Sequence, residues 1–136
     1  MYKDLVSNYE IRRAISPVSV ADNTPAVSQI IDMQGVSAMM FAILTGSVAD
    51  ADATFAVLIE EGDNAALSDA AAVADADLVS TEALASFQFD DDDETRKIGY
   101  KGIKRYVRLT ITPSGNASAA LLAAVAICEP QLKPAA

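Results

Sequence analysis

The feature that most constrains the fold is a period of two in short apolar segments. Residues 103–112 show it most clearly, because Val107, Leu109 and Ile111 alternate with polar or aromatic side chains. Residues 53–60 alternate in the same way. Neighbouring side chains of a β-strand point to opposite faces, so this period is typical of strands with one buried face. We therefore expect strands in both segments, with the basic side chains of 103–112 exposed.

Turn-forming residues divide the chain into further segments of strand length. The stretch PSGN at 113–116 is a compact turn signal, and we expect it to join 103–112 to 118–127 as a hairpin. The expected strands lie near residues 17–20, 27–33, 37–45, 53–60, 78–80, 84–89, 96–100, 103–112 and 118–127. Sandwiches and jelly rolls have about eight such strands. The sequence thus predicts an all-β fold, a jelly-roll-like β-sandwich of about eight short antiparallel strands.

Two Ala-rich stretches fit this interpretation less well, because alanine favours helix. Residues 64–78 suit a short helix or a long loop equally. The apolar run that ends at Cys128 could also be helical, but the turn before it favours an antiparallel strand.

The length of 136 residues fits one domain. We expect an N-terminal arm over residues 1–15 and a single jelly-roll domain over residues 16–136. Within the arm, Tyr9, Arg12 and Arg13 are residue types that suit contact with a neighbouring chain.

The composition predicts a thin core and an assembled protein. Hydrophobic residues make up 51% of the chain, but much of this is alanine and aromatic residues are only 6%. Many small apolar residues then remain outside the core. We expect another chain to cover part of this apolar surface.

Few residues suit catalysis or metal binding. The chain has no histidine and one cysteine, Cys128, so neither a Cys/His zinc site nor an internal disulfide can form. We expect Cys128 to be a small buried hydrophobe, because no histidine can activate it. The expectation is a protein without cofactor or metal that is not an enzyme. The longest apolar run, residues 117–128, is too short for a bilayer, so no membrane contact is expected.

Five consecutive acids, Asp90, Asp91, Asp92, Asp93 and Glu94, stand out in the sequence. A calcium loop, a solvated hairpin tip and a docking surface for a charged partner are the three alternatives. The run lacks the alternate spacing and the glycine of a calcium-binding EF-hand loop. We expect a hairpin tip, where water, the adjacent bases or a partner screens the repulsion between the acids. The opposite charges that follow directly also suit docking, because complementary charge fixes the orientation of a partner.

The opposite charges are six bases within 13 residues: Arg96, Lys97, Lys101, Lys104, Arg105 and Arg108. They suit docking to an acidic protein patch, pairing with the acids at 90–94, or nucleic-acid binding. The formal net charge of −9 opposes the last of these, and we expect no direct contact with nucleic acid.

Residues 22–35, 45–83 and 96–116 resemble a family of small proteins that tailed phages and prophages encode beside the major capsid protein, the capsid cement or head decoration proteins. The resemblance implies a jelly roll on the outer surface of an icosahedral head. It would bridge major capsid subunits and stabilise the shell after synthesis in the bacterial cytoplasm. The implied partners are the major capsid protein and further copies of the chain, with a homodimer favoured over a trimer.

No motif of that family identifies contact residues, so the candidate partner-binding residues come from charge. They are Asp90–Glu94, the six bases and the three arm residues named above. The alternative function is a free or tail-associated β-sandwich that binds carbohydrate or calcium.

Overall fold

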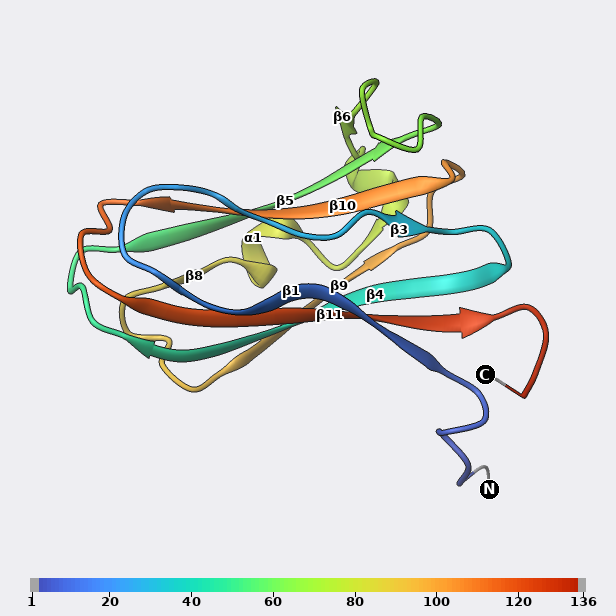
Figure 1. Cartoon of the computed structure of the whole chain (residues 1–136), viewed down its shortest axis with the longest axis horizontal. Coiled ribbons are helices and arrows are strands. Elements are labelled where there is room, and N and C mark those ends of the chain that lie inside the picture. Colours follow the sequence, from blue (N-terminus) through green and yellow to red (C-terminus); the bar gives the residue numbers. More distant parts are fainter. Residues whose placement is uncertain (1–2, 135–136) are drawn as a thin grey trace.

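The computed structural model describes residues 3–134 and shows two β-sheets packed face to face (Figure 1). Sheet A has the strand order β1-β11-β4-β9-β7. Sheet B has the order β2-β10-β5-β6, with β3 beside β10 and β8 beside β5. Neighbouring strands in both sheets are antiparallel. The predicted all-β sandwich is confirmed.

The elements differ widely in length. The strands of sheet A are β1 (Glu10–Val20), β4 (Val36–Val48), β7 (Leu78–Val79), β9 (Thr95–Tyr100) and β11 (Ala120–Pro130). The strands of sheet B are β2 (Ala26–Val27), β3 (Ile31–Asp32), β5 (Thr54–Gly62), β6 (Ala71–Ala72), β8 (Phe87–Gln88) and β10 (Tyr106–Ser114). The helices are a 3₁₀ turn η1 (Asp75–Asp77) and one turn of α1 (Glu82–Ala85).

The prediction of a hairpin at residues 113–116 is wrong. The turn instead carries the chain from β10 in sheet B to β11 in sheet A, and these strands pair with different neighbours. Gly115 has a φ of +65°, which supplies the reversal without strain. A turn sequence specifies a change of direction, but it does not specify whether the two strands pair side by side or stack.

The core lies between the sheets, where the expected alternation is confirmed. Val107, Leu109 and Ile111 of β10 are completely buried. From β5, the ring of Phe55 stacks on that of Phe87, with 4.8 Å between ring centroids. Cys128 is also completely buried, as expected, and burial raises the pKa of its thiol.

Three segments differ in detail from the sequence prediction. Residues 64–78 form no α-helix; their helical part is the 3₁₀ turn η1. Residues 84–89, expected as a strand, contain the end of α1 and the two-residue β8. Residues 10–15, expected in the arm, lie in β1 and pair with β11.

The short helix α1 closes an open edge of sheet B. The side chain of Ser86, just after the helix, accepts a hydrogen bond from the Val57 backbone N–H at 3.0 Å. Glu82 accepts another from the Ile59 N–H at 2.7 Å. These bonds satisfy backbone groups of β5 that would otherwise offer an edge to another strand.

We predict that Phe55→Ala lowers the free energy of unfolding by about 3–5 kcal/mol, because it leaves a cavity against Phe87. Phe89→Ala is the matched control, since Phe89 is 41% exposed and a surface substitution costs about 0.5 kcal/mol. Urea unfolding at neutral pH measures both. Equal losses for the two variants would contradict the described core.

Acid should destabilise the fold through carboxylates that accept backbone hydrogen bonds. Asp50 accepts from the N–H groups of Asp52 (2.9 Å) and Ala117 (2.8 Å), and these bonds lower its pKa below the ordinary 3.8. A lowered pKa in the folded state means that the stabilisation is present above about pH 3.8 and is lost as the pH falls further. We predict that Asp50→Asn loses less stability than the wild type between pH 5 and pH 3. Urea midpoints at both pH values test this, and identical losses would refute it.

Candidate docking surfaces

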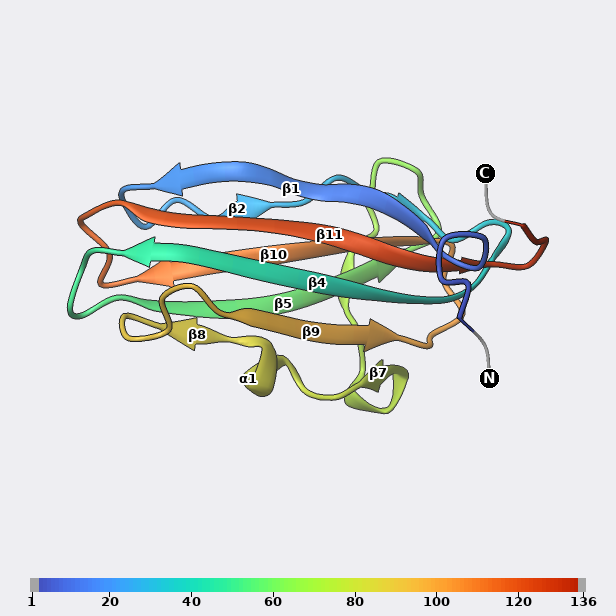
Figure 2. The same ribbon diagram turned by 90° about the horizontal axis from the view of Figure 1, so that it is seen from below.

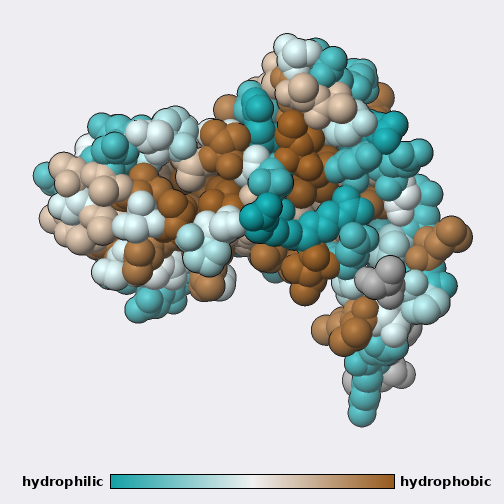
Figure 3. All heavy atoms as spheres, viewed as in Figure 1, coloured by the Kyte–Doolittle hydropathy of each residue, from teal (hydrophilic) through white to brown (hydrophobic). Residues whose placement is uncertain are grey.

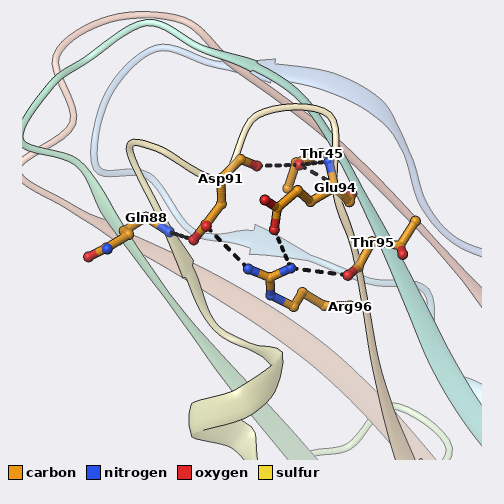
Figure 4. A network of polar contacts seen from close by, with 6 residues as sticks. All are labelled: Thr45, Gln88, Asp91, Glu94, Thr95 and Arg96. Carbon is orange, nitrogen blue, oxygen red and sulfur yellow. Dashed lines mark hydrogen bonds and ion pairs between the residues drawn. The ribbon is translucent and has the colours of Figure 1, made fainter.

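The five acids at 90–94, called the acid loop here, form an ordered crossover from β8 to β9 (Figure 4). Arg96 lies 3.3 Å from the Asp91 carboxylate and 2.7 Å from that of Glu94. The buried hydroxyl of Thr45 donates to the Asp91 carbonyl at 2.7 Å and accepts from the Glu94 N–H at 2.9 Å. The loop therefore joins the two sheets and is not a hairpin tip.

Only part of the acid loop is neutralised. Arg96 pairs with two of the five acids, while Asp90, Asp92 and Asp93 are exposed and have no ion pair among residues 3–134. Repulsion between neighbours is reduced because the chain turns sharply: Asp93 has a φ of +55° and donates its N–H to the Gly46 carbonyl. Within residues 3–134, no three Cys, His, Asp or Glu side chains gather as a metal site.

The six bases do not share one face. Arg96 and Lys97 lie on β9 of sheet A, and Arg108 lies on β10 of sheet B. The other three, Lys101, Lys104 and Arg105, lie in the connection between these strands.

Three of these six bases pair with acids outside the acid loop. Arg108 contacts Glu60 at 2.9 Å, across the β5–β10 ladder. Lys104 contacts Asp63 at 3.0 Å, and Arg105 contacts Asp32 at 2.9 Å. Lys97 and Lys101 are exposed, with no ion pair among the described residues. The basic cluster of the sequence is thus mainly a set of separate ion pairs.

The three arm residues also differ in their surroundings. Arg12 pairs with Glu10 at 2.8 Å and donates to the Asp32 carbonyl at 2.7 Å, so it ties β1 to β3. Tyr9 is 39% exposed. Arg13 is exposed and donates to the Ser16 hydroxyl at 3.0 Å, without an ion pair in the described part of the chain.

A surface that was not located from the sequence covers the outer side of sheet A, seen face on in Figure 2. We call it the apolar face. Its strands β1, β11 and β4 place apolar side chains outward as well as inward. The outward side chains are Ile11, Met40, Ala42, Leu44, Leu121, Ala123, Val125 and Ile127.

At one end of the apolar face, the N-terminal segment and β7 border a groove of about 860 Å³. Leu5, Val6 and Tyr9 line it from the N-terminal side, and Val79 lines it from β7. Leu5 and Val6 are 64% and 86% exposed. The groove extends the apolar surface beyond the sheet itself.

Sheet B is different on its outer side. Its strand β10 exposes Tyr106, Arg108, Thr110 and Thr112 to varying degrees, and the Arg108–Glu60 pair lies among them. The side view of the surface (Figure 3) shows apolar residues in the band between the two layers. The two outer faces therefore differ in polarity, because sheet A is apolar on both sides whereas the outer side of sheet B is polar.

The sequence does contain a signal for this surface. Residues 37–45 and 118–127 are almost continuously apolar, whereas 53–60 and 103–112 alternate. Strands with an unbroken apolar run are typically covered on both faces. Within residues 3–134, no element of this chain covers the outer face of sheet A. These unbroken apolar runs therefore mark a sheet face that is open to solvent.

No protein-family description matches this sequence, and no curated protein matches it. Solved structures do match at the level of the fold. The exported protein XepA of PBSX, which is phage-related, has 14% sequence identity and a TM-score of 0.57, over 96% of this chain. This chain spans 39% of the length of XepA.

Two further matches involve xylan. The xylan-binding module CBM15 has 13% identity and a TM-score of 0.51, over 95% of each chain. Xylanase 10C of Cellvibrio japonicus, solved with xylopentaose, has 12% identity and a TM-score of 0.50, over 93% of this chain and 28% of the enzyme. Identities this low establish a shared sandwich fold. No helix among residues 3–134 is long and apolar enough to cross a membrane.

We predict that Thr45→Val lowers the free energy of unfolding by about 1–2 kcal/mol, because it leaves partly buried backbone groups of the acid loop without a partner. Thr95→Val is the control, since Thr95 is exposed on the adjoining strand. Urea unfolding measures the loss. Susceptibility of the loop to limited proteolysis should increase in Thr45→Val alone, and equal behaviour of both variants would contradict the role of Thr45.

Proposed function

We propose that this chain is a structural protein of a tailed-phage particle, and that it acts as a capsid cement protein. In this proposal it binds the outer surface of the icosahedral head and bridges neighbouring major capsid subunits. The observation that carries the proposal is the apolar face. A sandwich with a complete core of its own, and a second apolar surface left over, has a surface suited to binding another protein.

The resemblance of residues 22–35, 45–83 and 96–116 to the cement family supports this function. The member that the sequence resembles is the cement protein of a Bordetella phage head. The sandwich shared with the phage-related XepA agrees with the proposal at the level of the fold.

The proposed protein uses no cofactor or metal and catalyses no reaction. Its partners are the major capsid protein and further copies of itself, with a homodimer preferred to a trimer. Asp90, Asp92, Asp93 and Lys101 are secondary contact candidates, because their charges are exposed and have no ion pair within residues 3–134. Contacts of this kind weaken as salt screens them.

Carbohydrate binding is the alternative function, and two structurally similar proteins bind xylan or a xylan fragment. Sugar-binding surfaces of proteins commonly offer exposed aromatic rings. Here Tyr106 is partly covered by the Arg105 guanidinium, 5.1 Å from the ring centroid, and Tyr9 and Phe89 lie in separate segments. This arrangement gives no specific support to a sugar ligand.

The test is reconstitution with heads of the encoding phage that were assembled without this chain. We expect the purified chain to bind saturably, with a stoichiometry near that of the major capsid subunit, and to raise the temperature at which the heads rupture. Heads that already carry the protein are the control and should bind none. Failure to bind heads, together with retardation of the chain in a xylan gel, would favour the alternative.

A further inference from the structure

Two unpaired cations flank the apolar face on a single rung of sheet A. The strand register aligns Arg13 of β1 with Val125, Val125 with Ala42, and Ala42 with Lys97 of β9. Residues directly opposite each other in a sheet share one side, so all four side chains point outward. With about 4.8 Å between strands, the Cα atoms of Arg13 and Lys97 are about 14 Å apart across the rung.

Most bases of the chain form ion pairs among the described residues, although Lys3 and Lys101 also lack one. Acids outnumber bases by 19 to 10, and six of the bases form ion pairs within residues 3–134. Yet Arg13 and Lys97 have no such partner there. Glu129, the carboxylate that borders the groove, is 3.6 Å from Lys133 and also accepts from Ser37 at 3.3 Å.

We propose that the apolar face docks on a protein surface that is apolar at its centre and carries carboxylates on both sides. The partner's carboxylates would complete the two ion pairs that Arg13 and Lys97 lack, while its apolar centre covers Val125 and Ala42. This inference rests on the proposed function, in which the partner is the head surface. It adds the docking face and the chemistry that the face recognises.

A second copy of this chain is a poor occupant of the same face. If two copies pack face to face about a twofold axis that runs across the strands through this rung, Arg13 of one copy lies opposite Arg13 of the other. Lys97 likewise lies opposite Lys97. If the twofold axis instead runs along the strands through the middle of the rung, Arg13 of one copy lies opposite Lys97 of the other. Both arrangements bring like charges together in a surface that excludes water, which is unfavourable. Pairing of copies on a head would then use another surface.

The experiment measures binding of variants to the heads lacking this chain. Arg13→Glu/Lys97→Glu reverses the flanking charges, and Val125→Lys disrupts the apolar centre. We expect each to bind at least tenfold more weakly than the wild type, whereas Arg13→Lys/Lys97→Arg should bind within about threefold of it. Thr112→Glu is the control, because it adds a carboxylate at an exposed position on the outer side of sheet B, away from the apolar face and the groove.

The outcomes separate the two proposals. Absence of wild-type binding overturns the proposed function, and this inference with it. Normal binding by the double charge reversal and by Val125→Lys overturns only the docking face. A wild-type dimer in sedimentation velocity that Val125→Lys dissociates would show that a second copy occupies the face, which also overturns the inference. Circular dichroism verifies folding, and if Val125→Lys unfolds, the charge reversal at exposed positions decides alone.

Discussion

The pairing of β4 with β11 is the constraint on which the rest of the structure depends. These two long strands form the middle of sheet A, and the register runs from Ala120 beside Val48 to Pro130 beside Val36. Their inward side chains, among them Phe41, Ile43 and Cys128, close the core against sheet B. Their outward side chains are apolar as well, so the ladder that completes the core also creates a surface that water solvates poorly. The core and the proposed docking surface are thus two sides of the same pair of strands.

How much of this was readable from the sequence depends on what each strand faces. Strand β10 alternates, so its buried residues Val107, Leu109 and Ile111 were predicted correctly. Strand β11 is apolar on both sides, and its pattern fits a strand or a helix almost equally. The order of strands was not readable either, because β4 finds its partners β9 and β11 far along the chain. A turn such as that at 113–116 reverses the chain in a paired hairpin and in a crossover alike.

The charged residues were harder to interpret, because sequence proximity suggested the wrong partners. The acid loop and the bases after it are neighbours in the chain, yet Arg96 is the base that pairs with that loop. Arg105 and Arg108 find Asp32 and Glu60 through the packing of sheet B, and the sequence gives no indication of these pairs. In the proposed docking, the charges that remain unpaired matter more than the local clusters do. Their identification required the complete set of ion pairs in the described chain, which only the fold provides.

An exposed apolar sheet is a hazard for a protein made in many copies, because such faces stick to one another. The same charges that suit the apolar face to a partner reduce this hazard. Arg13 and Lys97 repel their counterparts when two such faces meet along or across the rung, and the overall charge of −9 keeps copies apart at longer range. The edge of β5, where Ser86 and Glu82 bind backbone N–H groups, is closed to strand addition. Under the proposed function, a chain built in this way stays dispersed at high concentration until it meets a surface that offers both an apolar centre and the missing carboxylates.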